Sequence, residues 1–164
     1  RHTRPRVVYN GVGHPGPAAG TAHGPGLPVH RPIRLMTLAP GHFHAALVQK
    51  HMVPGVHHRA HVYAPLDDDT LSHLARVAAF NARRDAPTYW EIDARLGGAY
   101  LDRMLREQPG NAVVLAGRNR PKVDRLLACA AANLPVLADK PWVVEAPDFG
   151  KLEEVFRQAE LRDV

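Results

Sequence analysis

A length of 164 residues suits one globular domain, at about 100–200 residues per domain. No stretch approaches the roughly 18 uninterrupted apolar residues that a membrane span needs, so we expect no membrane partner. Residues 1–66 hold seven Lys and Arg without any Asp or Glu, whereas residues 67–164 hold 14 Lys and Arg against 16 Asp and Glu. The net charge of +5 therefore comes from the front of the chain. Because its basic residues do not cluster with aromatic residues on a folded face, we expect no nucleic-acid partner.

The cysteine and histidine content shows whether a disulfide or a metal site is to be expected. The single cysteine, Cys129, excludes an internal disulfide and is typical of a small buried apolar residue. All 11 histidines lie in the first half of the chain, and the pairs His42/His44 and His57/His58 are candidate metal ligands. The cysteine spacings of structural zinc sites and the H-E-x-x-H motif are absent. We favour solvated or capping histidines, expect no metal, and keep a histidine metal site as a minor alternative.

The first 32 residues differ in texture from the rest. Residues 1–32 hold six Pro and six Gly and show no hydrophobic periodicity. Such a segment buries too little apolar surface to offset its ordering entropy, so we expect a disordered tail. It lacks the charged start and apolar core of a secretory signal, which favours a cytoplasmic location. Because the first residue is Arg rather than Met, we expect the natural start to lie upstream.

From residue 33 on, short apolar runs alternate with helical patterns. In chain order these predict a strand at 33–39, a helix at 43–52, a strand at 58–64, a helix at 67–84, a strand at 88–93, a helix at 99–108, a strand at 111–117, a helix at 121–133, a strand at 134–141 and a helix at 148–164.

Two of these helices carry more detailed signals. The helix over 67–84 has acidic residues in its first turn and arginines in its last, as the helix dipole favours. Its buried stripe is predicted at Leu71, Leu74, Val77 and Ala78. Asp148 is expected to cap the last helix.

Strands that are almost continuously apolar and alternate with helices favour a parallel sheet covered on both faces. We therefore predict an α/β fold, a doubly wound parallel sheet, as one domain over residues 33–164. In such a sheet ligands bind outside the carboxyl ends of the strands, near the point where the strand order reverses. Three strand exits carry the candidate site.

The first exit reads LAPGHFHAA. Against the dinucleotide fingerprint G-x-G-x-x-G, its three glycine positions are Ala39, Gly41 and His44, so only the central glycine is present. That glycine would let the backbone approach a pyrophosphate at the N-terminus of a helix from Phe43. Ala39, Gly41, His42 and Phe43 are thus candidate cofactor-binding residues. A plain strand-to-helix turn is an equally good interpretation.

The second exit, LAGRN, leaves the sheet at Gly117 and continues with Arg118 and Asn119. Asn119 offers both a donor and an acceptor just before a helix. All three residues are candidate cofactor contacts, and an ordinary helix cap is the alternative for Asn119.

The third exit, PVLADKPW, delivers Asp139, Lys140 and Pro141 at the end of a predicted interior strand. An amine that is partly removed from water has a lowered pKa and exchanges protons near neutrality. Pro141 fixes a backbone dihedral and limits where that amine can point. A lysine after a strand is usually solvated, but its place after the two other exits makes Lys140 the catalytic candidate. All three residues are also candidate cofactor contacts.

Together these stretches resemble the Gfo/Idh/MocA family of glucose–fructose oxidoreductases and inositol dehydrogenases. PVLADKPW resembles the family's strand ending in Glu-Lys-Pro, with Asp139 replacing glutamate, and is the most specific part. VVLAGRN resembles the preceding strand and LMTLAPGHFHAAL the first strand with its nucleotide-binding turn. The resemblance covers roughly residues 33–164. It implies a Rossmann domain that binds NAD or NADP, and hydride transfer to or from a sugar, polyol or similar small-molecule substrate, with Lys140 assisting proton transfer.

The chain also departs from the family pattern. The first and third fingerprint glycines are absent, and the second strand ends VYAP, where Tyr63 and Ala64 replace the acidic residue that usually holds the ribose. Tyr63 is kept as a candidate cofactor contact, and the choice between NAD and NADP stays open. The resemblance implies a C-terminal substrate domain beyond Val164, so we expect a fragment that is inactive alone; homo-oligomer formation stays open. The alternative is a non-catalytic Rossmann-like binding or assembly module that has lost cofactor use.

Overall fold

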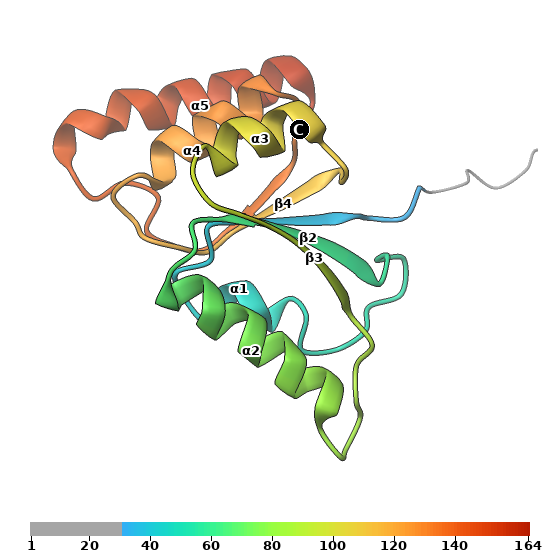
Figure 1. The fold of residues 1–164 in the computed structure, drawn as a ribbon. Helices are drawn as coiled ribbons and strands as arrows, with labels where there is room; N and C mark the ends of the chain where they lie inside the picture. Colours follow the sequence, from blue (N-terminus) through green and yellow to red (C-terminus); the bar gives the residue numbers. More distant parts are fainter. Residues whose placement is uncertain (1–30) are drawn as a thin grey trace, which may run out of the picture.

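The structure is a computed structural model that describes residues 31–164. The predicted tail over 1–32 falls almost wholly outside these residues. Five parallel strands form one sheet in the order β3-β2-β1-β4-β5 (Figure 1). The strands are β1 (Leu35–Leu38), β2 (Arg59–Ala64), β3 (Glu91–Leu96), β4 (Ala112–Leu115) and β5 (Val136–Ala138). The helices are α1 (His44–Leu47), α2 (Asp68–Ala82), α3 (Tyr100–Glu107), α4 (Lys122–Ala131) and α5 (Phe149–Arg162), with a short 3-10 turn, η1 (Ala146–Asp148), before α5.

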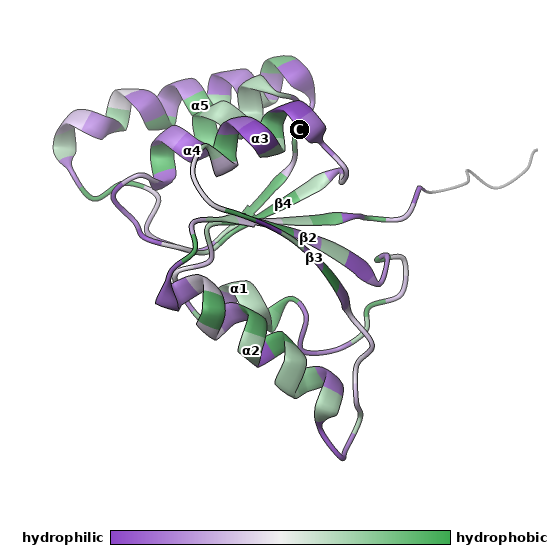
Figure 2. Ribbon diagram, in the orientation of Figure 1, coloured by the Kyte–Doolittle hydropathy of each residue, from purple (hydrophilic) through white to green (hydrophobic). Residues whose placement is uncertain are grey.

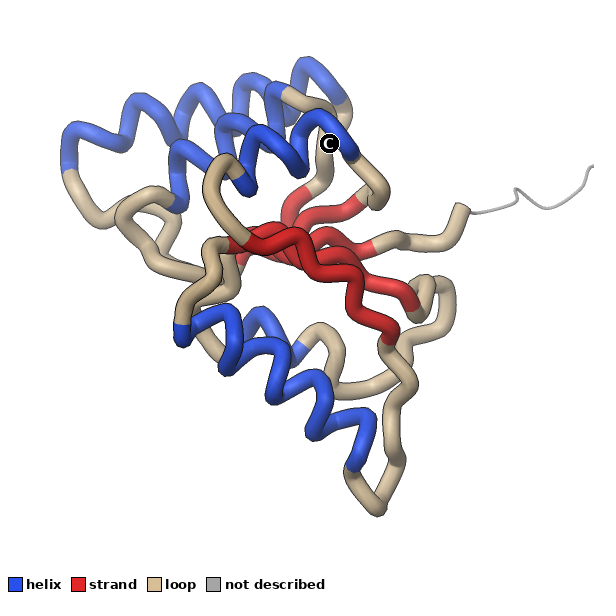
Figure 3. Tube along the Cα trace, viewed as in Figure 1, coloured by secondary structure: helices blue, strands red, loops and turns tan. Residues whose placement is uncertain are grey.

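Helices cover both faces of this sheet. α1 and α2 lie against one face, and α3, α4 and α5 lie against the other (Figures 1 and 3). Strand order reverses between β1 and β4, because the chain moves outward from β1 to β3 and then returns to β1's other side. The predicted doubly wound α/β fold is confirmed. None of the helices over residues 31–164 is long and apolar enough to cross a membrane.

Two apolar layers hold the sheet and helices together. Because successive strand residues point to opposite faces, Met36 and Leu38 of β1 pack toward α3, α4 and α5. Leu35 points the other way and packs with Val77 of α2 and with Trp90. Figure 2 shows hydrophobic colouring along much of the strands, whereas the helices alternate between hydrophobic and hydrophilic segments. Burying each large apolar side chain contributes about 1.5–3 kcal/mol, so the two layers together hold the helices on the sheet.

Two helices differ in detail from the prediction. α1 has four residues instead of the expected ten. The N–H groups of Gln49 and Lys50 donate to carbonyls three residues back rather than four, so the chain leaves α-helical geometry after Leu47. On α2 the buried stripe is Thr70, His73 and Val77. The predicted stripe was wrong except at Val77, since the Asp67 carboxylate caps the Thr70 N–H and that start sets which side faces the sheet.

The charge pattern at two helix ends also differs. The last turn of α2 contains no basic residue, because the helix stops before Arg83, whose guanidinium donates to the carbonyl of Lys50 at 2.6 Å. Asp148 makes no capping hydrogen bond to α5 and instead pairs with the Lys151 ammonium at 3.0 Å. Cys129 is fully buried, and burial raises the pKa of its thiol to about 12, as expected of a structural cysteine.

Candidate functional site

The turns after β1 and β4 press backbone against backbone. A Cβ added to Gly117 would collide with the carbonyl oxygen of Ala39, and one added to Gly41 would lie 3.2 Å from the Arg118 nitrogen. The N–H groups of Gly41 and His42 donate to the Ala116 carbonyl at 3.2 and 3.1 Å. The two turns therefore form one unit, and Gly117 is the position where a side chain would break it.

This contact changes the expected pyrophosphate seat. Two backbone donors of the first turn already have an acceptor, and α1 begins at His44 and is only four residues long. The helix expected from Phe43 is thus a short one that begins at His44, and its role as a seat for a pyrophosphate stays a prediction. Ala39, at the first fingerprint position, has a φ of +42°, in the left-handed region that glycine prefers.

A carboxylate stands beside the first turn. Asp69, in the first turn of α2, accepts hydrogen bonds from Arg118 Nε at 2.8 Å and pairs with its Nη2 at 2.6 Å. The Asp69 oxygen would lie 3.3 Å from a Cβ on Gly41. Sequence reasoning sought an acidic residue at the end of β2 and missed this one, which arrives from the following helix. The run Asp67-Asp68-Asp69 directly after β2 was the available signal.

The three predicted strand exits meet in one cavity. A pocket of about 240 Å³ is lined by Gly41, His42, Gly117, Arg118, Asn119, Asp139 and Lys140. Lys140 is exposed, and a cis peptide bond joins it to Pro141. The structure thus brings together residues from 41 to 140 that the sequence placed at a common sheet edge, while their roles remain predictions.

Lys122 is the residue that sequence reasoning missed in this region. Its side chain is fully buried, and its ammonium group donates to Asp139 Oδ1 at 2.5 Å, to the Asp139 carbonyl at 3.1 Å and to Asn119 Oδ1 at 2.9 Å. Three acceptors match the three protons of a lysine ammonium group. Asn119 therefore uses its side-chain oxygen to bind Lys122 instead of capping α4. The buried Lys122 ammonium group thus holds the side chains of both Asn119 and Asp139 in place.

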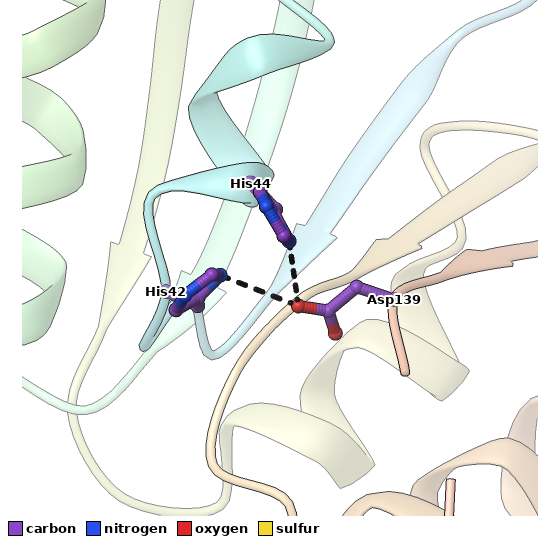
Figure 4. A group of neighbouring side chains, drawn as sticks. All are labelled: His42, His44 and Asp139. Atoms are coloured by element: carbon purple, nitrogen blue, oxygen red, sulfur yellow. Dashed lines mark hydrogen bonds and ion pairs between the residues drawn. The ribbon is translucent and has the colours of Figure 1, made fainter. Parts of the chain in front are cut away.

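The other oxygen of Asp139 faces two imidazoles. Oδ2 lies 3.2 Å from Nδ1 of His44 and 3.4 Å from Nδ1 of His42 (Figure 4). His42 lies in the turn between β1 and α1, His44 is the first residue of α1, and Asp139 follows β5. These three side chains form a group that could hold a metal ion.

A neighbouring pocket of about 200 Å³ lies on the α2 side of the first turn, and its lining comprises Gly41, His42, Phe43, Ala46, Asp69, Ser72, His73 and Arg76. His73 is buried, and neither of its ring nitrogens has a hydrogen-bond partner within residues 31–164. Burial lowers the pKa of His73 to about 4. The pocket thus offers a carboxylate, Asp69, and a guanidinium, Arg76. Ala39 lines a third pocket of about 240 Å³ on the other side of Gly41.

Tyr63 lies away from these pockets. Its side chain is fully buried among the residues beneath α3, and its hydroxyl donates to Glu107 at 2.7 Å. Burial, with the Glu107 hydrogen bond as a second cause, raises the pKa of Tyr63 to about 12. The alternation of β2 turns this side chain into the core, so the predicted cofactor contact of Tyr63 is not supported.

The arrangement combines an exposed amine, a buried ammonium–carboxylate pair and two imidazoles around one pocket. The Lys140 amine lies at the pocket surface, where it can hydrogen-bond to a ligand. Arg118 offers positive charge to an anion, provided that it gives up Asp69. The imidazoles and the Asp139 carboxylate can bind a proton or a metal ion.

Comparison with known proteins gives solved structures of similar fold. The chain is 40% identical to a "putative oxidoreductase" from Parabacteroides merdae, with a TM-score of 0.80 over 82% of this chain and 30% of that one. It is 17% identical to GenD2 from gentamicin A biosynthesis, solved in complex with NAD, with a TM-score of 0.55 over 88% of this chain and 36% of that one.

A third similar structure is myo-inositol 2-dehydrogenase from Lactobacillus plantarum, 16% identical, with a TM-score of 0.51 over 80% of this chain and 34% of that one. The chain spans about a third of the length of these proteins. No protein-family model and no curated protein matches it. These structural neighbours are oxidoreductases and dehydrogenases.

Proposed function

We propose that this chain is the nucleotide-binding part of an NAD(P)-dependent oxidoreductase of the Gfo/Idh/MocA family. The observation that carries the proposal is the single pocket at which three strand exits meet, because dinucleotides bind at this edge of a doubly wound sheet. The 40% identity to an oxidoreductase supports it. The substrate class we propose is a sugar, polyol or similar molecule with a CH–OH carbon, bound with the help of a second domain.

The cofactor is proposed to enter by a route that the fingerprint does not describe. The glycines at 41 and 117 leave open the pocket that Lys140 also lines, which fits the nicotinamide end. Because the N–H groups of Gly41 and His42 already donate to the Ala116 carbonyl, we expect Arg118, which lines two of the pockets, to meet the pyrophosphate. Arg76, in the neighbouring pocket, suits the extra phosphate of NADP, which NAD lacks, so both NAD and NADP are candidates.

In the proposed reaction the bound cofactor supplies a nicotinamide ring that accepts or donates hydride. Lys140 takes the proton of the substrate hydroxyl as the carbon is oxidised, and returns it in the reverse direction. Positioned proton transfer of this kind contributes typically about 10²–10⁴-fold to a rate. Asp139, anchored by Lys122, fixes the backbone from which Lys140 extends.

A second candidate is a non-catalytic binding or assembly module that has lost cofactor use. The observation that favours it is the closed first turn, in which Ala116 occupies the backbone donors and the Asp69 carboxylate stands beside Gly41. A negative charge at this place opposes a pyrophosphate.

Titration with NADH and with NADPH separates the two candidates. Binding to the purified chain is followed by calorimetry, with the fold checked by circular dichroism. Asp69→Asn removes the carboxylate and frees Arg118, so we expect it to tighten NADH binding by roughly 3- to 10-fold at low salt. Asp68→Asn is the matched control: it makes the same charge change at an exposed neighbouring position and is expected to leave affinity unchanged.

Two outcomes would count against the enzyme. If neither nucleotide binds the folded wild type or Asp69→Asn at millimolar concentration, the binding module is the better conclusion. In a protein that also carries a substrate domain, Lys140→Ala is expected to lower kcat by about 100-fold or more while NADH still binds. Unchanged turnover would remove Lys140 from the mechanism.

A further inference from the structure

We propose that His42, His44 and Asp139 bind a divalent transition-metal ion such as zinc, with three protein ligands and one open coordination position. The sequence predicts no metal, with a histidine site as a minor alternative, because the known zinc motifs are absent. The structure brings together ligands that no short motif contains, since Asp139 lies 95 residues beyond His44. The inference stands on this geometry and needs no bound nucleotide.

The distances match those within a metal site. Tetrahedral zinc lies about 2.0–2.2 Å from nitrogen and oxygen ligands, which places two ligand atoms about 3.3–3.5 Å apart. The Asp139 Oδ2 atom is 3.2 Å from Nδ1 of His44 and 3.4 Å from Nδ1 of His42. Ligand atoms of the three residues all lie within 4.8 Å of one another. Both distances from Asp139 Oδ2 thus suit coordination as they stand, and any wider separation between the two imidazoles is closed by side-chain rotation.

The carboxylate is already oriented for coordination. Lys122 and Asn119 form a buried support, in which the Lys122 ammonium group binds Oδ1 of Asp139 and leaves Oδ2 directed at the imidazoles (Figure 4). Metal-bound carboxylates are commonly held by such outer hydrogen bonds. Figure 4 shows both imidazoles pointing toward this one oxygen, His42 from the turn before α1 and His44 from the first residue of α1.

The ligand types select the class of metal. Two imidazoles and one carboxylate suit zinc and its first-row neighbours, whereas magnesium and calcium prefer oxygen ligands throughout. The positive charge of Lys122 on the far side of Asp139 further disfavours the hard cations, whose binding depends on carboxylate charge. We therefore expect zinc or cobalt(II) to bind and magnesium not to compete.

The fourth position opens on the pocket. His42 and Asp139 line the cavity that Lys140 also lines, and the two imidazoles are 44% and 43% exposed. Three protein ligands with one open position are typical of catalytic rather than structural zinc sites. An ion here would present its free position to a water molecule or to an oxygen atom of a ligand in the pocket.

Cobalt(II) titration of the metal-free chain tests the site, because tetrahedral cobalt has a strong visible absorption that aqueous cobalt lacks. We expect one equivalent to bind with that absorption and to be displaced by zinc. His42→Ala and His44→Ala each remove one ligand from an exposed position. His57→Ala is the matched control, because His57 and His58 form another adjacent histidine pair, with ring centroids 4.6 Å apart.

We expect each ligand variant to weaken cobalt binding by at least about 100-fold, beyond the roughly 10–100-fold cost of a lost outer partner. His57→Ala should change the affinity less than about twofold. No binding to the folded wild type, equal affinity in His44→Ala, or the same loss in His57→Ala would each overturn the proposal. NADH binding is measured separately without metal, so failure of this site and failure of the proposed function remain distinguishable.

Discussion

Lys122 offers a sharp test of how the pocket is held together. The Lys122→Met substitution keeps the buried aliphatic chain and removes the ammonium group, so little cavity is created. The Asp139 carboxylate then loses its charged partner at Oδ1. The Asp139 carbonyl and the Asn119 side-chain oxygen each lose a hydrogen-bond donor. Removing one partner of a buried ion pair costs about 3–5 kcal/mol. Because Asp139 still faces two imidazoles and is 15% exposed, we expect the lower end, about 3 kcal/mol.

The chain contains a matched control. Lys151 pairs with two carboxylates, Asp124 at 2.7 Å and Asp148 at 3.0 Å, and its side chain is 43% exposed. Lys122 pairs with one carboxylate, and its side chain is fully buried. Exposed ion pairs contribute little to folding, so Lys151→Met should leave the unfolding midpoint almost unchanged. The substitution is the same in both variants and each lysine has two partner residues, so burial is the main difference between the two positions.

Urea unfolding, followed by the fluorescence of the buried Trp90, measures both variants. With a urea m-value of about 1.5 kcal/mol/M, a loss of about 3 kcal/mol lowers the midpoint by about 2 M. Adding Asp139→Leu to Lys122→Met removes the uncompensated carboxylate and should recover most of the loss. Equal midpoints for the two lysine variants, or no recovery in the double variant, would refute the reasoning.

Three further predictions concern the turns and His73. Ala39→Gly relieves a left-handed conformation worth about 1–2 kcal/mol and increases unfolded-chain entropy by about 0.4–1 kcal/mol, so the urea midpoint should hold or rise; a clear fall would contradict it. Gly117→Ala forces a Cβ onto the Ala39 carbonyl and should cost at least about 2 kcal/mol in thermal unfolding, a result that an unchanged Tm would exclude. Burial lowers the His73 pKa to about 4, so between about pH 6.5 and 4 the unfolded chain binds a proton that the folded chain does not, and stability falls by roughly 3 kcal/mol as pH drops through that window. His73→Leu should flatten this fall, measured by urea unfolding at several pH values, whereas exposed His51→Leu should not; parallel curves for His73→Leu and wild type would rule out the assignment.

The sheet and the meeting of strand exits were predictable because both follow from local patterns. Apolar runs ending at Gly117 and Asp139 are visible in the sequence, and parallel strands place their carboxyl ends at one edge. The boundaries of α1 and the buried side of α2 were not predictable in this way. They depend on how a helix starts and on which neighbour it meets, as the Asp67 cap and the burial of His73 show.

Long-range partners account for what the sequence concealed in the site. In the sequence Lys122 is an ordinary helix residue, and only the folded chain brings Asp139, 17 residues later, into contact with its ammonium group. Asp69 reaches the first turn from a helix rather than from a strand end, and its partner Arg118 lies 49 residues away. Tyr63 looked available because its strand ends at the site, yet strand alternation points it into the core. Such pairings are set by tertiary packing, which no short window of sequence contains.

The position of β5 at the edge of the described sheet links occupancy of the pocket to folding. β5 has three residues and hydrogen-bonds along β4, yet the residue after it, Asp139, closes the pocket against the turn that follows β1. A ligand that contacts both Asp139 and the turn after β1 therefore links the short edge strand β5 to the central strand β1. Amide hydrogens of Val136–Ala138 should therefore exchange more slowly once the pocket is filled, because the bound ligand stabilises this short edge strand against local opening.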